Sequence, residues 1–355
     1  MMQGRAVSRR RATLRTDLTL LALIGVLLIA ALGAGGMALY QQFYGPSAFV
    51  QRYLDLLSSG QAADALRVPG VSVDLSAEQD GAIDSVASEA LLRTAALGPL
   101  TDYEVTAEKH EDGVYIVSTD YRASGVEGTS TFSVVQDGWV GVVPNWRFER
   151  SPLAEIDLTV RGADVFSVNG FEIDRRQVSP DGAAAEPLDS LHLLVFTPGA
   201  YSVTVDTPIA ATPGVRVLAD TALARTPVDV QAMPTEEFTG IVQQKVEEFL
   251  TTCAGQEVLL PTACPFGLEV QNRLADGSLP RWSIVTQPTV SVQPDGAHWV
   301  IPPTEAVAHI DVKIMSLFDG SVHEVSEDVP FEVDGTIRIL PDGTASIRVG
   351  SPGSE

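Results

Sequence analysis

A long apolar stretch without polar periodicity lies at residues 18–40, and amphipathic patterns begin only after it. Residues 18–40 contain no charged side chain. Five arginines precede this stretch, namely Arg5, Arg9, Arg10, Arg11 and Arg15. About 20 apolar residues are enough for a helix to cross a bilayer, and arginines mark the cytoplasmic side of such helices. The pattern predicts a cytoplasmic tail over 1–17, a transmembrane helix over 18–40 and an extracytoplasmic remainder.

A cleaved signal peptide is the alternative, because it also begins basic and then turns apolar. Small residues at 30–36 would suit a signal peptidase. The apolar core of a signal peptide usually runs about 7–15 residues, which is shorter than this stretch and favours an uncleaved anchor. Ala30, Ala31, Ala34 and Gly35 also offer a small-residue face on which two such helices could pack, so a homodimer is an open alternative.

The segment 46–151 changes from a helical to a strand period. Phe49, Val50, Tyr53, Leu54 and Leu57 form one helical stripe, for which Ser47 provides a cap and Gly60 an end. A short helix over 61–67 and a third helical stripe over 83–97 follow. From residue 103 to residue 148 the apolar positions recur every second residue, which predicts a meander of half-buried strands.

Two further segments complete the chain, and both are rich in strands. Asp-Gly occurs nine times after residue 40, and this pair is a strong signal for tight hairpins. The segment 152–233 shows strand patterns without a convincing helix. The segment 234–350 begins with a helix that Thr235 caps and continues as a meander. We therefore expect a β-rich α+β fold of antiparallel sheets in three domains, 46–151, 152–233 and 234–350.

Two of these segments resemble known module families. The run from Phe49 to Leu66, FVQRYLDLLSSGQAADAL, followed by a sheet resembles exported NTF2-like proteins, which implies a cone of sheet over a helix. In the second segment, Val168-Asn169-Gly170 and Pro198-Gly199-Ala200-Tyr201-Ser202-Val203 resemble small PEGA-like β-sandwich modules. Such modules serve as spacers or adhesive units. The third segment repeats the plan of helix and meander, so we read it as a second NTF2-like unit.

The order of tail, helix and sheet modules resembles membrane proteins associated with teicoplanin susceptibility. Those proteins usually carry a cytoplasmic zinc ribbon, whereas this chain has no cysteine before Cys253. Three lysines stand against twenty arginines, a bias typical of GC-rich genomes and of actinobacteria. The resemblance implies a role in the bacterial cell envelope.

Charge limits the set of partners. After residue 17 the chain contains 18 basic and 45 acidic residues, which gives a net charge near −27. Such a surface repels nucleic acid and anionic lipid, and it attracts cations or a basic partner. Cys253 and Cys264 would lie in an oxidising compartment outside the membrane, so a disulfide between them is expected. Two cysteines without a nearby histidine do not complete a tetrahedral zinc site.

The sequence contains no motif that specifies catalysis. It lacks a phosphate-binding loop, a His-Glu-x-x-His motif and a Gly-x-Ser-x-Gly elbow. The five histidines are scattered, although His309 and His323 could meet across a hairpin, and His110 is expected to be exposed beside a turn. The four tryptophans suit core positions better than a carbohydrate platform.

We therefore assign no catalytic, cofactor-binding or metal-binding residues and expect no cofactor. The function expected is that of a non-catalytic, membrane-anchored binding or scaffold protein of the cell envelope. Its partner would be an envelope protein or a cell-wall polymer. Two alternatives stay open: a hydrolase or isomerase working in an NTF2-like pocket, and a structural spacer.

Overall fold

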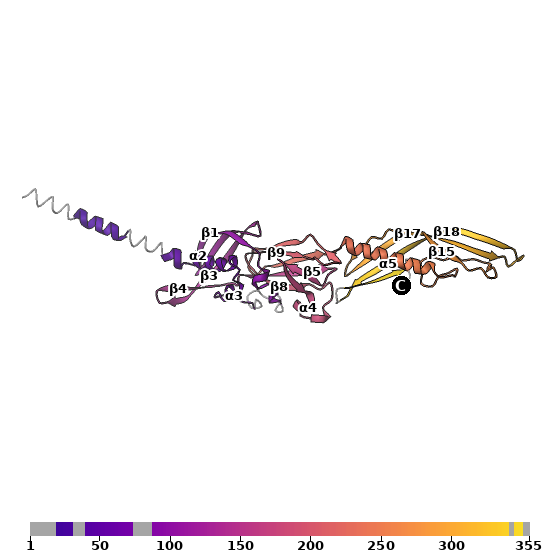
Figure 1. Cartoon of the computed structure of the whole chain (residues 1–355). Helices are drawn as coiled ribbons and strands as arrows, with labels where there is room; N and C mark the ends of the chain where they lie inside the picture. The colour runs from indigo at the N-terminus through magenta and orange to yellow at the C-terminus, as the bar shows by residue number, and fades with distance from the viewer. Residues whose placement is uncertain (1–18, 31–39, 74–86, 341–343, 351–355) are drawn as a thin grey trace, which may run out of the picture. The chain divides into compact units, whose positions relative to one another are not determined.

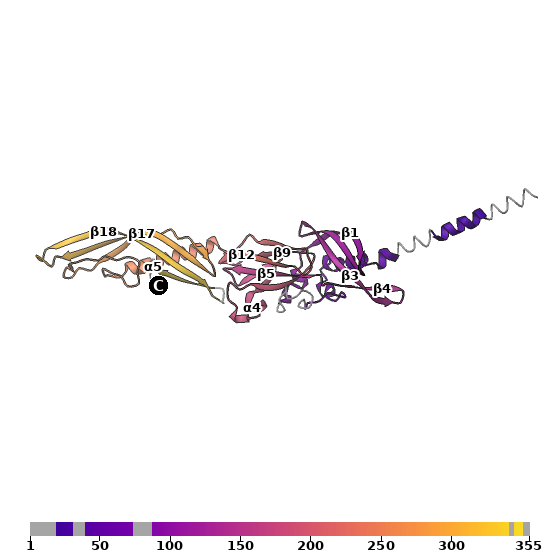
Figure 2. The same cartoon turned by 180° about the vertical axis from the view of Figure 1, so that it is seen from behind.

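The computed structural model describes residues 19–30, 40–73, 87–340 and 344–350. They form two compact units. Unit 1 comprises residues 1–72, 99–152 and 220–222, and unit 2 comprises residues 73–98, 153–219 and 223–355. Figure 1 shows the elements of each unit by label, and Figure 2 shows them from behind.

Unit 1 is built from one main helix and a four-stranded antiparallel meander. Its elements are α2 (Pro46–Ser58), α3 (Ala62–Ala65), β1 (Leu100–Glu111), β2 (Val114–Ala123), β3 (Val126–Val140) and β4 (Val143–Phe148). The strands pair in sequence order, β1-β2-β3-β4. The predicted helices at 49–57 and 61–67 and the predicted meander are therefore confirmed.

An aromatic cluster between α2 and the sheet forms the core of unit 1. Tyr53 of α2 is fully buried, and its ring lies 6.1 Å from Phe132 and 5.1 Å from Phe148 in edge-to-face contacts. Phe49 lies 4.9 Å from Phe148. Edge-to-face aromatic pairs add about 0.5–1.5 kcal/mol each beyond the burial of their area. The apolar stripe recognised in the sequence is thus the face that α2 turns to the sheet.

The start of α2 differs from the prediction. Gly45, not Ser47, is the N-cap residue, and Pro46 occupies the first turn. Proline suits this position because its fixed φ matches a helix and the missing N–H would be unpaired there anyway. Ser47 lies inside the first turn, and its hydroxyl donates to the Glu108 carboxylate of β1.

The predicted helix at 83–97 is wrong over its described part, from residue 87 on. Residues Glu89–Leu91 and Thr94–Ala96 form two separate 3-10 turns, and they belong to unit 2. Ser88 explains the difference, because its N–H donates to His192 O and its C=O accepts from Leu194 N. These bonds to β8 replace helical ones, and they bring the buried Leu91 and Ala96 into the core of unit 2.

Unit 2 contains two sheets over residues 153–231, a long helix and a C-terminal sheet. The elements up to residue 234 are β5 (Leu153–Arg161), β6 (Val165–Val168), β7 (Phe171–Asp174), α4 (Arg175–Val178), β8 (Leu191–Phe196), β9 (Gly199–Thr204), β10 (Ala210–Ala211), β11 (Val215–Ala219), β12 (Arg225–Gln231) and β13 (Met233–Pro234). The remaining elements are α5 (Glu236–Ala254), β14 (Arg273–Leu274), β15 (Arg281–Thr286), β16 (Gln293–Asp295), β17 (His298–Met315), β18 (Val322–Ile339) and β19 (Ala345–Gly350).

The two sheets of the 153–231 region have the orders β12-β5-β8 and β11-β9-β6-β7. Most strand pairs are antiparallel as expected, but β12 pairs with β5 in parallel. The turn between β6 and β7 is tight, because Asn169 and Gly170 both take positive φ values, 50° and 83°. Asn169 also ties this turn to β9 by accepting from Ser202 N at 2.9 Å.

A short helix, α4, was not predicted from the sequence. Asp174 caps it by accepting from Arg176 N at 2.9 Å. The guanidinium of Arg175 is fully buried and donates to the carbonyl oxygens of Val160, Glu186 and Asp189 at 2.6–3.0 Å. Its burial lowers the pKa of Arg175 from the ordinary value. These bonds hold the irregular segment after α4 against β5.

The C-terminal part of unit 2 consists of α5 and an antiparallel sheet around the long β17–β18 hairpin, seen in Figures 1 and 2. The predicted cap is confirmed, since Thr235 Oγ1 accepts from Phe238 N at 3.1 Å. Phe238 packs against Trp299 of β17 with ring centroids 5.5 Å apart. One continuous buried cluster includes residues from β5, β8, α5 and β17. The expected boundary at 233/234 therefore does not divide two compact units.

Three of the four tryptophans occupy core positions, as the sequence suggested. Trp146, Trp282 and Trp299 are buried, whereas Trp139 is 62% exposed.

The described residues include no helix that is long and apolar enough to cross a membrane. Of the predicted span 18–40, residues 19–30 and 40 are described and helical, and the others lie outside the described residues, as does the tail 1–17.

The predicted disulfide is present between Cys253 and Cys264, whose Cα atoms lie 5.7 Å apart. Cys253 is buried at the end of α5, so the bond fastens the following loop to this helix. A loop of this order restricts the unfolded chain and contributes about 3 kcal/mol in the chain-entropy model.

We expect that replacing both cysteines by alanine lowers the free energy of unfolding of unit 2 by about 3 kcal/mol. Urea denaturation of the full chain, with and without the two substitutions, measures this difference. In the unsubstituted chain, neither thiol should react with an alkylating reagent until a reductant is added. Alkylation of either cysteine in the native, unreduced chain would contradict the assignment.

Candidate functional site

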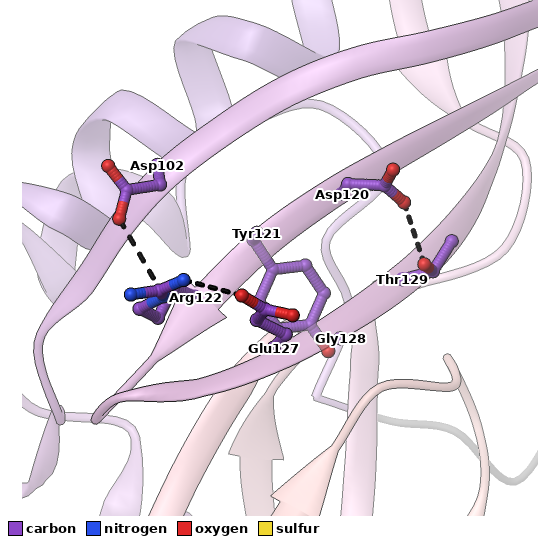
Figure 3. Close-up of a pocket in the computed structure, with 7 residues that line it drawn as sticks. All are labelled: Asp102, Asp120, Tyr121, Arg122, Glu127, Gly128 and Thr129. Atoms are coloured by element: carbon purple, nitrogen blue, oxygen red, sulfur yellow. Dashed lines mark hydrogen bonds and ion pairs between the residues drawn. The ribbon is translucent and has the colours of Figure 1, made fainter.

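A polar hollow lies on unit 1 where β1, β2 and β3 run side by side (Figure 3). Its lining residues are Asp102, Asp120, Tyr121, Arg122, Glu127, Gly128 and Thr129. Alternation along β2 produces this surface, because Val117, Thr119, Tyr121 and Ala123 are buried while Asp120 and Arg122 are exposed. The buried set faces the core, and the charged set faces solvent.

A bulge in β1 brings a carboxylate to the hollow. The pairing of β1 with β2 shifts between Thr101 and Glu104, and Asp102 has a positive φ of 51° there. Its carboxylate lies 3.8 Å from the Nε atom of Arg122, while Glu127 binds the other side of the same guanidinium. Figure 3 shows Arg122 between these two acids. Bulges commonly redirect side chains at a strand edge in this way.

The back of the hollow depends on a glycine. A Cβ atom at position 128 would lie 2.6 Å from Tyr121 Oη, so the ring of Tyr121 can cover β3 only because residue 128 is glycine. Burial raises the pKa of the Tyr121 hydroxyl above its ordinary value. Beside it, Thr129 donates to Asp120 at 2.7 Å.

The hollow carries three carboxylates and one guanidinium. The side chains of Asp102 and Glu127 are 72% and 79% exposed, and that of Arg122 is 45% exposed. Exposed ion pairs contribute little to stability, typically about 0–1 kcal/mol each, and their groups exchange partners readily. This arrangement suits reversible binding of a cationic or hydrogen-bonding group.

A second charged cluster lies on the β12-β5-β8 sheet of unit 2. Glu155 of β5 is fully buried, and its carboxylate lies 2.7 Å from His192 Nδ1 and 3.3 Å from Arg225 Nε. Asp157 also contacts Arg225, at 3.1 Å. The strand pairing explains the cluster, since Arg225 lies opposite Glu155 and His192 lies opposite Asp157.

The chemistry of this cluster depends on the tautomer of His192. Its Nδ1 atom lies 2.7 Å from Glu155 and 2.9 Å from an Nη atom of Arg225. A protonated Nδ1 donates to Glu155, whereas an unprotonated one accepts from Arg225, so the two bonds cannot form at once. In either state the Glu155 carboxylate keeps its contact with Arg225, as in a structural network of charges.

The other histidines lie apart from each other. His309 of β17 is opposite Asp328, while His323 is opposite Ile314, so the two histidines do not meet across the hairpin. His309 Nδ1 lies 2.7 Å from Asp328, and this hydrogen bond raises the pKa of His309 above its ordinary value. His110 is exposed, as expected, and stacks on Tyr115 with centroids 4.1 Å apart.

No group of three or more histidine, cysteine or acidic side chains within the described part of the chain is arranged to hold a metal ion. The sequence analysis missed both the Figure 3 hollow and the Glu155 cluster. The alternation Glu155-Ile156-Asp157 places the two acids on one side of a strand. The parallel neighbour that supplies Arg225 is not predictable from local sequence.

Comparisons with known proteins add little. No protein-family model and no curated protein matches the chain. A solved structure described as an Ntf2 like protein involved in plasmid conjugation aligns with 82% of this chain and 86% of its own length, at 8% identity. Its TM-score is 0.11, so this likeness carries no argument about fold or function.

The burial of Glu155 predicts that its partner Arg225 matters for stability. Breaking a fully buried ion pair costs about 3–5 kcal/mol. The Arg225 side chain is 38% exposed, so we expect Arg225→Ala to cost less, about 2 kcal/mol after allowance for solvent screening. Urea denaturation of the full chain measures the change.

Arg161→Ala is the matched control, because Arg161 also joins β5 to β12. Its side chain is 40% exposed, but its partner Asp229 is 53% exposed instead of buried. We expect this control to cost less than about 1 kcal/mol. If both substitutions lower the free energy of unfolding by the same amount, the burial of Glu155 does not determine the stability of the sheet.

Proposed function

We propose that the protein is a membrane-anchored, extracytoplasmic binding or scaffold protein of the cell envelope and that it is not an enzyme. The observation that carries the proposal is the uncharged stretch 18–40 directly after five arginines. Such a stretch anchors a chain with its N-terminus in the cytoplasm. The parts of both units that follow residue 40 would then lie outside the membrane.

The disulfide supports this location. Disulfides persist in oxidising compartments and are rare in the reducing cytosol. The bond between Cys253 and Cys264 has one sulfur in the buried face of α5, so the native packing of this helix includes it. The strongly acidic composition is also typical of soluble, exported surfaces.

We assign residues 46–151 to the NTF2-like class and residues 152–233 to the PEGA-like class. The helix α2 over a meander supports the first assignment, and the Asn169-Gly170 turn between β6 and β7 supports the second. The order of the segments resembles membrane proteins associated with teicoplanin susceptibility, and the arginine-rich composition resembles that of actinobacterial proteins. We do not extend the proposal to a shared role with the former, because this chain has no cysteine before Cys253 for their zinc ribbon.

The polar hollow of Figure 3 is the binding face that we favour in unit 1. Its exposed carboxylates would attract a positively charged group on an envelope protein or wall polymer, and Arg122 would orient an accompanying acceptor. The enzyme alternative has its best support in the buried pair of His192 and Glu155. The Glu155 carboxylate already has His192 and Arg225 as partners, which is why we prefer binding over catalysis.

A fusion experiment tests the location. Alkaline phosphatase attached after residue 350 should be active in bacteria that produce the full chain, because this enzyme folds only outside the cytoplasm. A matched fusion that ends at residue 17, before the apolar stretch, should be inactive. Activity from the short fusion alone, or from neither fusion, would contradict the proposed orientation.

A further inference from the structure

The β3–β4 hairpin extends beyond the rest of the sheet of unit 1. Val135 is the last residue of β3 that pairs with β2, whereas β3 continues to Val140 and pairs there with β4 alone. Five residues of strand rise about 16 Å, so the end of the hairpin is a projecting two-stranded ribbon. Figure 1 shows this ribbon at the label of β4.

The tip of this ribbon is apolar and exposed. Residues 138–146, GWVGVVPNW, contain no charged side chain. Trp139, Val140 and Val142 are 62%, 72% and 79% exposed. Scattered exposed apolar residues are normal in proteins, but contiguous ones on a projecting tip mark a surface that contacts an apolar partner.

The tip touches the chain at the point where the uncharged stretch 18–40 ends. The Tyr40 hydroxyl donates to the carbonyl oxygen of Val142. Trp146 Nε1 donates to Tyr44 O at 2.7 Å, and the rings of Tyr40 and Tyr44 lie 5.3 Å apart. Phe43, next to them, is 64% exposed. Aromatic residues of the hairpin thus lie close to aromatic residues of the helical segment 40–44 within unit 1.

We propose that the tip of the β3–β4 hairpin (Trp139, Val140 and Val142) inserts into the outer interface of the bilayer that residues 18–40 cross. This inference rests on the membrane anchor of the proposed function. Tryptophan and tyrosine concentrate at the level of the lipid headgroups, where their rings are partly buried and their polar atoms stay hydrated. Tyr40 would mark that level from the helix and Trp139 from the hairpin.

The backbone of the tip suits this environment. Unpaired N–H and C=O groups are costly near hydrocarbon, and a hairpin pairs most of its own. Val140 pairs with Val143 across the turn, and Gly141 has the positive φ of 66° that this tight turn requires. The carbonyl of Val142, at the turn itself, accepts the bond from Tyr40.

Charges near the tip indicate which lipids it would contact. Asp137 precedes the tip, and Glu108 lines the same side of unit 1 near Tyr40 and Trp139. These carboxylates disfavour deep insertion and anionic headgroups, so a shallow contact with zwitterionic lipid fits best. The hairpin would act as a second membrane contact and hold unit 1 at the surface.

An environment-sensitive fluorophore tests the insertion. The full chain with Val140→Cys is labelled with NBD and reconstituted into phosphatidylcholine vesicles that contain a lipid with a spin label near its headgroup. The native disulfide stays oxidised, so only the new thiol reacts. We expect blue-shifted emission, strong quenching by the spin-labelled lipid and protection from aqueous iodide.

Thr101→Cys is the matched control. Thr101 is exposed and lies at the opposite end of the same sheet, since it pairs with Arg122 near the β2–β3 turn. Its label should be quenched by iodide and not by the lipid. Adding Val142→Asp to the Val140→Cys chain should abolish the blue shift at residue 140 and leave the circular dichroism spectrum unchanged.

Flotation of the vesicles separates this inference from the proposed function. If the chain floats with the lipid and the labels at 140 and 101 respond alike, the hairpin does not insert and the anchor stands. If the chain does not float with the vesicles, the anchor itself is refuted and the inserted hairpin with it. A label at 140 that stays in lipid despite Val142→Asp would also overturn the role given to the tip.

Discussion

Burial of aromatic side chains between one helix and one face of a sheet is the interaction on which each unit depends. In unit 1, Tyr53 of α2 lies between Phe132 and Phe148 of the sheet. In unit 2, Phe238 of α5 packs on Trp299 of β17. Because the helix covers one face only, the opposite face must be polar, and the alternation along β2 places Asp120 and Arg122 there. The hollow in Figure 3 is thus a direct consequence of the packing.

Local periodicity explains why much of this architecture could be predicted. The helices α2 and α5, the meander of unit 1 and the disulfide all follow from stripes, turns and spacing near each residue. The failures involve contacts between distant parts of the chain. Residues 88–96 form 3-10 turns because Ser88 bonds to β8, and β12 runs parallel to β5, so neither result is visible in a local pattern.

The candidate sites show the same difference between contacts that are local in the sequence and contacts between distant segments. The sequence correctly placed Cys253 and Cys264 together because they lie close along the chain. It did not group Glu155, His192 and Arg225, which come from three strands. Nor did it predict that Trp139 is exposed, because the apolar run around this residue, GWVGVVPNW, suits a core strand equally well. The strand pairing shows that this tryptophan lies on a projecting ribbon, because β3 continues to pair with β4 after its pairing with β2 has ended at Val135.

Function follows from the distribution of charged and apolar surface. In the Glu155 cluster both acids contact Arg225 in a largely buried setting, whereas the hollow of unit 1 leaves its carboxylates exposed. Three carboxylates around one arginine favour recognition of a positively charged group. This contrast is the reason why we propose binding as the function and propose a structural role for His192.

Site-specific photo-crosslinking in cells can show whether the hollow of unit 1 binds a partner. A photoreactive amino acid replaces Thr129 in the hollow, and in a control chain it replaces Glu332, which is exposed on β18. The account predicts a defined crosslinked partner from position 129, absent from position 332 and lost on charge reversal by Asp120→Lys. Crosslinks of equal pattern from both positions, or none from position 129, would contradict binding at this face and would favour a structural spacer.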